Sequence, residues 1–175
     1  AAATAAVALD EGLSVEAVIE GLSTFAGVGR RFEQLGILAH RRGSAYLVDD
    51  YGHHPTEVEA TLNSAAQVWP ESRVVMIYQP HRFTRTRDLY DDFVRVLSRC
   101  DVLILLDVYA AGEPEIPGAD SKALARSIRS RGHVEPIYAA SIDEVPQILC
   151  DLLNDQDVVI TQGAGNITSL AHSLT

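Results

Sequence analysis

The sequence has few cysteines, few basic residues and no long apolar run, and each shortage excludes a class of protein. Its two cysteines, Cys100 and Cys150, lack the spacing of metal ligands and each follows an apolar helical pattern, so we expect buried thiols in a reducing cytoplasm. No run of about 18 apolar residues is present, as a membrane span would require. The net charge of −10 argues against a general nucleic-acid binder. We therefore expect neither nucleic acid nor membrane among the partners.

Lysine is almost missing, and this bears on nucleotide binding. Lys122 is the only lysine, and the phosphate-binding motif GxxxxGK[ST] does not occur. The remaining basic residues are arginines, whose planar guanidinium groups pair with carboxylates and phosphates. If this protein uses ATP, we expect the phosphate-binding loop to lie outside these residues.

The chain has the length and composition of an ordinary globular domain. Its 175 residues can bury a sizeable core, and 47% of them are apolar. It starts with AAATAAVALDEG, in the middle of an apolar helical pattern and without a methionine. We expect the chain to be a part of a longer protein.

Strands and helices alternate along most of the sequence. The apolar periodicity predicts helices over residues 1–10, 15–25, 55–68, 86–99, 121–132 and 143–153, and after the turn 163–166. It predicts strands over residues 31–40, 44–50, 73–79, 102–108, 135–139 and 157–162. Such alternation indicates a doubly wound, mostly parallel α/β sheet of Rossmann-like type, with one antiparallel hairpin strand and a short helical segment before it.

The polar loops gather at one predicted edge of the sheet. In open parallel sheets, ligands bind beyond the carboxyl ends of the strands. Four unusual loops follow strands in this way: DDYGHHPTE, QPHRFTRTR, VYAAGEPEIPG and QGAGN. This asymmetry predicts a functional face there.

The loop DDYGHHPTE permits two interpretations. Its aspartates and histidines are metal-ligand types, but adjacent His53 and His54 rarely reach one ion and the spacing matches no known zinc motif. Alternatively, a histidine or aspartate caps the helix that Pro55 begins, and Glu57 complements the helix dipole. We expect no protein-held metal in this chain.

The loop QPHRFTRTR also has two interpretations. If the segment is helical, Arg82 and Arg85 share a face near the helix start and suit an anionic ligand. Otherwise Arg82, Arg85 and Arg87 form a solvated basic face paired with Asp88, Asp91 and Asp92.

The turn QGAGN either cradles a phosphate or is simply tight, since two glycines alone are a weak signal. A stand-alone nucleotide-binding module is one alternative function. A metal hydrolase using Asp49, Asp50, His53 and His54 is another.

Taken in order, several long motifs resemble the C-terminal region of the Mur ligases over essentially the whole chain. They are GVGRRFE, VDDYGHHPTE, YQPHRFTRTRDLYDDF, LDVYAAGE, IPGADS and TQGAGN. The resemblance implies that residues 1–28 are the end of the family's central ATPase domain. It implies that residues 29–175 are the third domain, which closes on the active site.

The resemblance implies an ATP-dependent ligase of bacterial, cytoplasmic peptidoglycan precursor synthesis. In such enzymes ATP with Mg²⁺ phosphorylates the muramoyl carboxylate, and an amine attacks the acyl phosphate. The wording GHHPTE is most similar to members that add L-alanine to UDP-N-acetylmuramate; members that attach a whole tripeptide are the alternative. ATP and Mg²⁺ would bind mainly outside this chain, which should be inactive alone.

Residue roles also follow from the resemblance, motif by motif. Arg31 and Asp50 match residues expected near the nucleotide. Four residues match the set expected around the incoming L-alanine: Tyr51, His53, Arg82 and Arg85. Among these, His53, Arg82 and Arg85 are expected to be catalytic. The roles of His54 and His81 stay open.

Overall fold

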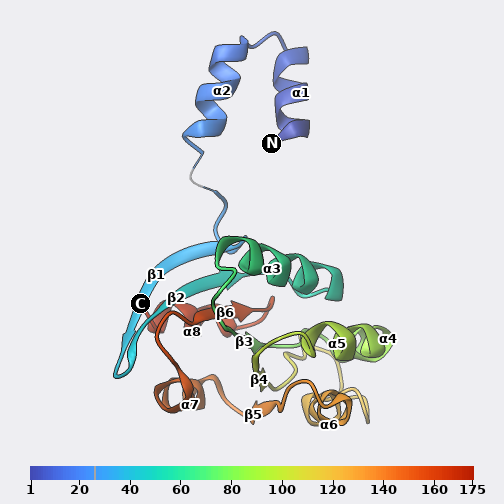
Figure 1. Cartoon of the computed structure of the whole chain (residues 1–175). Coiled ribbons are helices and arrows are strands. Elements are labelled where there is room, and N and C mark those ends of the chain that lie inside the picture. Colours follow the sequence, from blue (N-terminus) through green and yellow to red (C-terminus); the bar gives the residue numbers. More distant parts are fainter. Residues whose placement is uncertain (26) are drawn as a thin grey trace.

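The computed structural model describes residues 1–25 and 27–175, which include a six-stranded sheet in the order β1-β2-β6-β3-β4-β5 (Figure 1). The strands are β1 (Glu33–His40), β2 (Gly43–Asp50), β3 (Val74–Tyr78), β4 (Val102–Leu106), β5 (Ile137–Ala139) and β6 (Val158–Gln162). Only β1 and β2 pair antiparallel, and the other neighbours are parallel. The predicted doubly wound α/β fold is therefore confirmed.

Helices cover both faces of this sheet. One face packs against α3 (Pro55–Val68), α5 (Tyr90–Leu97) and α6 (Ser121–Arg131). The other packs against α7 (Val145–Leu152), which follows a short turn of 3₁₀-helix, and α8 (Ile167–Ser173). The strands β3 and β4 are apolar throughout because successive side chains enter opposite faces and both faces are covered.

The helices α1 (Ala2–Asp10) and α2 (Val15–Ser23) pack on each other and stand apart from the sheet (Figure 1). Neither helix buries a residue fully, and Ile19 and Phe25 are 61% and 63% exposed. Among the described residues, no helix is long and apolar enough to cross a membrane.

One predicted helix is wrong in its extent. Residues 86–99 were expected to form a single helix, but the chain forms α4 (Phe83–Asp88) and then α5, with non-helical backbone at Leu89. Each piece buries its own apolar side chains, with Phe83 in α4 and Phe93 in α5. The break serves this separate packing, which periodicity alone does not indicate.

The prediction of two buried thiols is half wrong. Cys100 is buried, and burial raises the pKa of its thiol to about 12. Cys150 is exposed. It directly follows Leu149, a buried residue of α7, and one residue turns a helix by roughly 100°. Its side chain therefore leaves the buried face.

The hydroxyl of Tyr78 gives a test of the core. Tyr78 is fully buried against Phe93, and its hydroxyl has no hydrogen-bond partner among the described residues. Since Tyr78→Phe keeps the ring, we expect the free energy of unfolding to stay unchanged or rise by about 1 kcal/mol in urea denaturation. As a control, Phe93→Ala should lose about 3–5 kcal/mol. A loss of more than about 1 kcal/mol in Tyr78→Phe would show that the hydroxyl is paired.

Candidate active site

Loops from four parallel strands meet at the carboxyl edge of the sheet. Backbone bonds continue the sheet beyond the strand ends: the N–H of Gly163 donates to the carbonyl of Asp50 (3.1 Å), and that of Gln79 to Gln162 (3.0 Å). After β3 the chain crosses toward β4, whereas β6 is reached by a return from β5. The loops after β3 and β6 therefore lie where the winding reverses, which is the usual ligand position in such folds.

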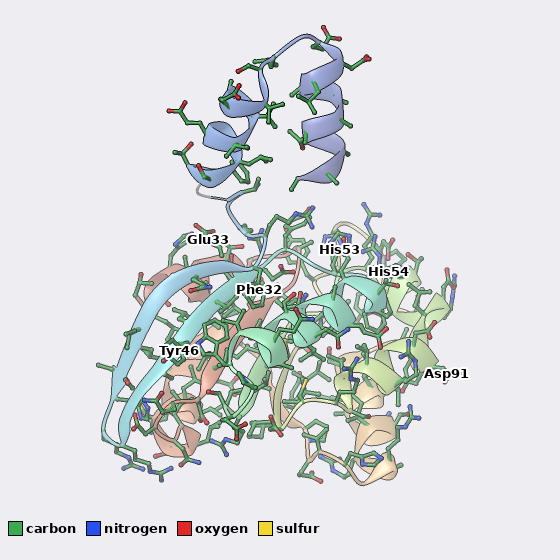
Figure 2. The ribbon with its side chains drawn as sticks, turned by 45° about the horizontal axis from the view of Figure 1, so that its top comes forward. Phe32, Glu33, Tyr46, His53, His54 and Asp91 are labelled. Atoms are coloured by element: carbon green, nitrogen blue, oxygen red, sulfur yellow. The ribbon has the colours of Figure 1, made fainter. Side chains whose placement is uncertain are left out.

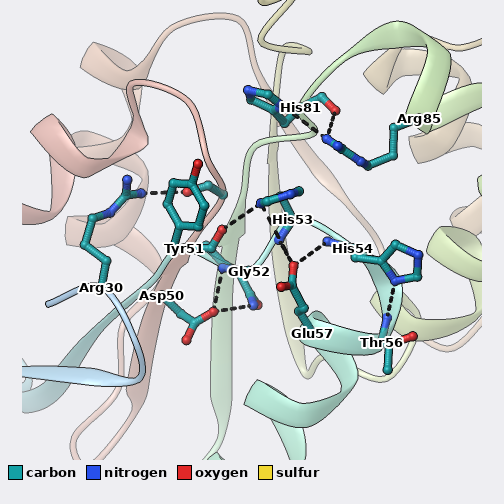
Figure 3. Close-up of polar contacts among 12 residues, drawn as sticks. Arg30, Asp50, Tyr51, Gly52, His53, His54, Thr56, Glu57, His81 and Arg85 are labelled. Atoms are coloured by element: carbon teal, nitrogen blue, oxygen red, sulfur yellow. Dashed lines mark hydrogen bonds and ion pairs between the residues drawn. The ribbon is translucent and has the colours of Figure 1, made fainter. Parts of the chain in front are cut away.

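Four aromatic rings form a row across this edge. The rings of Tyr51 and His53 meet edge to face, with centroids 5.2 Å apart. His81 lies 5.6 Å from His53 and stacks on Tyr109 at 5.5 Å. Figure 3 shows Tyr51, His53 and His81 at the ends of their strands. Residues from three separate loops thus build one wall, which includes the predicted Tyr51 and His53.

The adjacent histidines point in different directions (Figures 2 and 3). His54 is the N-cap of α3, and its Nδ1 accepts a hydrogen bond from the N–H of Thr56 (3.2 Å). The carboxylate of Glu57 accepts from the N–H groups of His53 (2.9 Å) and His54 (3.0 Å). Burial alone would raise the pKa of Glu57, but these donors outweigh it and lower the pKa. The helix-cap interpretation thus holds for His54 and Glu57.

The metal interpretation finds no support in the geometry. Within residues 1–25 and 27–175, no three His, Cys, Asp or Glu side chains come together in a way that could hold an ion. His53 instead faces the aromatic row, and its Nδ1 lies 3.2 Å from the carbonyl oxygen of Tyr51.

Arg85 determines the protonation state and tautomer of His81. Its Nη1 donates to Nδ1 of His81 (3.0 Å) and to the His81 carbonyl (2.9 Å). A guanidinium can only donate, so Nδ1 must accept and the imidazole must be neutral, with its proton on Nε2. Burial and the Arg85 cation lower the pKa of His81 in agreement with this state. The Nε2–H of His81 is then a hydrogen-bond donor near neutral pH.

Arg82 and Arg85 do not form the shared helical face that was predicted. Arg82 precedes α4 with a φ of 73°, and its Nη1 pairs with Glu113 at 3.2 Å. Glu113 also accepts from the N–H (3.0 Å) and the hydroxyl (2.7 Å) of Thr84. Backbone and hydroxyl donors from Thr84 and the Arg82 cation lower the pKa of Glu113. Sequence reasoning missed Glu113; its only signal was the polar loop after β4.

The basic-face alternative is correct only for Arg87, which pairs with Asp88 at 2.7 Å on the surface. Arg82 and Arg85 instead contact residues of the loops at the site, namely Glu113 and His81. Their guanidinium groups keep further N–H donors, because each carries five.

The residues expected near a nucleotide lie beside the aromatic row. Asp50 is buried, and its carboxylate accepts hydrogen bonds from the N–H groups of Phe32 (2.8 Å) and Gly52 (2.7 Å) and from the Gln162 amide (3.0 Å). The side chain of Arg31 is 56% exposed and lies 3.8 Å from Glu57. Both residues line a hollow of about 200 Å³. The largely exposed Arg31 and the buried Asp50 thus border the same hollow.

The turn QGAGN owes its glycines to close packing. A Cβ on Gly163 would lie 2.8 Å from the carbonyl oxygen of Gln79. A Cβ on Gly165 would lie 2.7 Å from the ring of Tyr109 and still closer to the Gln79 amide. The Gln79 side chain also bonds to Asn166 (2.8 Å) and to the N–H of Ile167 (3.2 Å). This geometry favours the tight-turn interpretation.

The chain thus has a Rossmann-like sheet with arginines and an aromatic row at its switch point, the usual ligand position in such folds. The sequence profile of the family described as "Mur ligase, glutamate ligase domain" matches residues 30–165. The chain belongs to this family of ATP-dependent ligases.

Several solved structures share the fold. The UDP-N-acetylmuramate–alanine ligase of Thermotoga maritima is 26% identical, with a TM-score of 0.76 over 97% of this chain and 34% of its own length. A murein peptide ligase of Psychrobacter arcticus is 21% identical, with a TM-score of 0.64 over 97% of this chain and 34% of its own.

A bifunctional folylpolyglutamate synthase/dihydrofolate synthase solved with Mn, AMPPNP and L-glutamate is 20% identical with a TM-score of 0.64. The alignment covers 93% of this chain and 34% of that enzyme. The chain thus spans about a third of the length of these relatives.

The cap on α3 predicts that His54 contributes to stability. His54→Ala should lower the free energy of unfolding by about 1 kcal/mol, because the N–H of Thr56 loses its acceptor. His54→Asn should retain most of the stability, since asparagine also caps well. Urea denaturation of both variants checks this. Equal losses in the two variants would contradict the capping role.

Proposed function

We propose that this chain is the C-terminal domain of a ligase that adds L-alanine to UDP-N-acetylmuramate in bacterial, cytoplasmic peptidoglycan precursor synthesis. The observation that carries the proposal is the meeting of Arg82, Arg85 and the aromatic row at the switch point of a Mur ligase domain. Higher identity and TM-score to the alanine ligase than to the murein peptide ligase support alanine as the amine.

The chemistry assigned to the site is positioning of the amine. A guanidinium pairs strongly with a carboxylate, so Arg82 or Arg85 would hold the carboxylate of alanine. His53 and Tyr51 would orient its amine toward the acyl phosphate, and His53 is placed to accept a proton from it. The Nε2–H of neutral His81 adds one more donor in the same row.

ATP supplies the phosphate that activates the muramoyl carboxylate, and this chain would touch one side of it. Arg31 and the hollow beside Asp50 fit a nucleotide edge. Residues 1–28 would be the end of the preceding ATPase domain, which would hold the phosphates and Mg²⁺. The exposed apolar side chains of α1 and α2 support this division.

The substrate test uses the full-length ligase with UDP-N-acetylmuramate and ATP. We expect phosphate release with L-alanine and far less with the tripeptide L-alanyl-γ-D-glutamyl-diaminopimelate. If the enzyme prefers the tripeptide, the tripeptide and not alanine is the amine substrate. Micromolar ATP binding by the 175-residue chain alone would favour a stand-alone nucleotide-binding module.

The arginines can be separated by substitution in the same enzyme. Arg82→Ala and Arg85→Ala should each lower kcat/KM for alanine by roughly 10- to 100-fold, mainly by raising KM, because a desolvated charged contact is lost. Arg87→Ala is the matched control in the same segment, since the one ion pair of Arg87 among the described residues is with the exposed Asp88. An unchanged KM in the first two variants would remove these arginines from the amine site.

A further inference from the structure

Arg30, rather than its neighbour Arg31, joins the linker before β1 to the ends of two strands. Its Nε pairs with Asp49 at 3.1 Å, and its Nη2 donates to the carbonyl of Gly163 at 2.6 Å. The guanidinium also lies over the ring of Tyr51, 4.9 Å from the centroid (Figure 3). The side chain of Arg30 therefore contacts three places at once: Asp49 at the end of β2, Gly163 in the turn after β6, and the ring of Tyr51.

Asp49 is the residue that requires a positively charged partner. This carboxylate is 1% exposed, and its other oxygen accepts a hydrogen bond from Thr161 (2.7 Å). A buried carboxylate is costly unless it is paired, and Arg30 is its ion-pair partner. The position of Arg30 is thus fixed by the sheet and not by the linker.

The linker backbone is held on both sides of Arg31. Arg30 and Phe32 have φ values of 58° and 51°, which non-glycine residues seldom adopt. The N–H of Tyr51 donates to the Arg30 carbonyl (2.8 Å), and that of Phe32 donates to Asp50 (2.8 Å). Between these two attachments Arg31 projects outward, with its guanidinium 5.5 Å from the Tyr51 ring.

A second ion pair in the chain, between Arg73 and Asp157, also joins an arginine to a buried aspartate and a backbone carbonyl, but without these neighbours. Arg73 bonds to Asp157 through Nε (3.1 Å) and Nη2 (2.7 Å) and to the carbonyl of Leu152 (2.9 Å). Its burial is similar: the side chains are 33% and 3% exposed, against 24% and 1% for Arg30 and Asp49. It lies at the amino ends of β3 and β6, away from the site. It shows what a purely structural pair looks like here.

We propose, building on the proposed function, that Arg30 is a positioning residue that holds Arg31 and Tyr51 in one arrangement. Arg31 serves the nucleotide and Tyr51 serves the amine. Through Arg30, the two ligand contacts keep a fixed relation to each other. Arg30 itself contacts neither ligand.

The experiment compares Arg30→Ala, Arg30→Lys and the control Arg73→Ala in the full-length ligase. We expect Arg30→Ala to raise KM for both ATP and the amine by about tenfold. Arg30→Ala and Arg73→Ala should lower the thermal midpoint by similar amounts. Arg73→Ala should nevertheless leave both KM values within about twofold of those of the unsubstituted enzyme. Arg30→Lys should regain stability, because it still pairs with Asp49, but not KM, because an ammonium lacks the planar fork that reaches Gly163 and stacks on Tyr51.

A second readout needs no substrate. Trp69 is the only tryptophan of the 175-residue chain, and its ring lies 6.1 Å from Phe32. Release of the linker in Arg30→Ala should shift its fluorescence emission, whereas Arg73→Ala should not. An unchanged emission in Arg30→Ala would overturn the proposal whatever the substrate proves to be.

The kinetic outcomes decide as clearly. Equal KM changes in Arg30→Ala and Arg73→Ala would reduce Arg30 to a structural residue. A change in KM for only one ligand would refute the coupling. If the enzyme prefers the tripeptide, the same comparison applies to that amine, so failure of the alanine assignment and failure of this proposal are distinguishable.

Discussion

The site depends on two adjacent carboxylates at the end of β2 that have lost almost all contact with water. Asp49 and Asp50 follow one another in a strand, so their side chains enter opposite faces of the sheet. Each must be satisfied by protein donors, since a buried carboxylate without partners is costly. Asp49 obtains Arg30 and Thr161, and Asp50 obtains backbone and amide N–H groups. The donors that meet this need come from the linker and from β6, so both are drawn to the end of β2.

This constraint explains why a strongly acidic chain presents cations at its site. Within the described residues, Arg30 is committed to Asp49, and Arg85 is committed to His81. Arg31 is left largely exposed beside Tyr51. Cations that the fold already holds lose little conformational freedom when an anionic ligand arrives. The proposed binding of an anionic ligand is therefore compatible with a net charge of −10.

Much of the fold was predictable because periodicity and strand-end loops are local signals. The strands, their hairpin and the functional edge follow from apolar runs and loop composition. The break at Leu89 was not predictable, because it depends on how α4 and α5 each pack. The exposure of Cys150 required knowing which face of α7 is covered.

The sequence allowed us to predict which loops form the site but not which residues pair with one another there. His53 and Tyr51 contact each other at the strand end that the loop composition marked, and the cap by His54 was one of the two interpretations. Glu113 and Arg30 were missed, because each acts through a residue far away in the sequence. Such pairings depend on the sheet order, in which β6 lies between β2 and β3. No local pattern encodes that order.

The Arg82–Glu113 pair shows how the loop after β4 can assist the site without contacting a ligand. Glu113 binds the first turn of α4 through Thr84 and holds the guanidinium of Arg82 through one Nη group. A guanidinium has five N–H donors, so Arg82 can keep Glu113 and still receive a carboxylate. The pair also stabilises the unfavourable backbone at Arg82, whose φ is 73°. Glu113 thus fixes the direction of a cation that would otherwise be a mobile side chain on the surface.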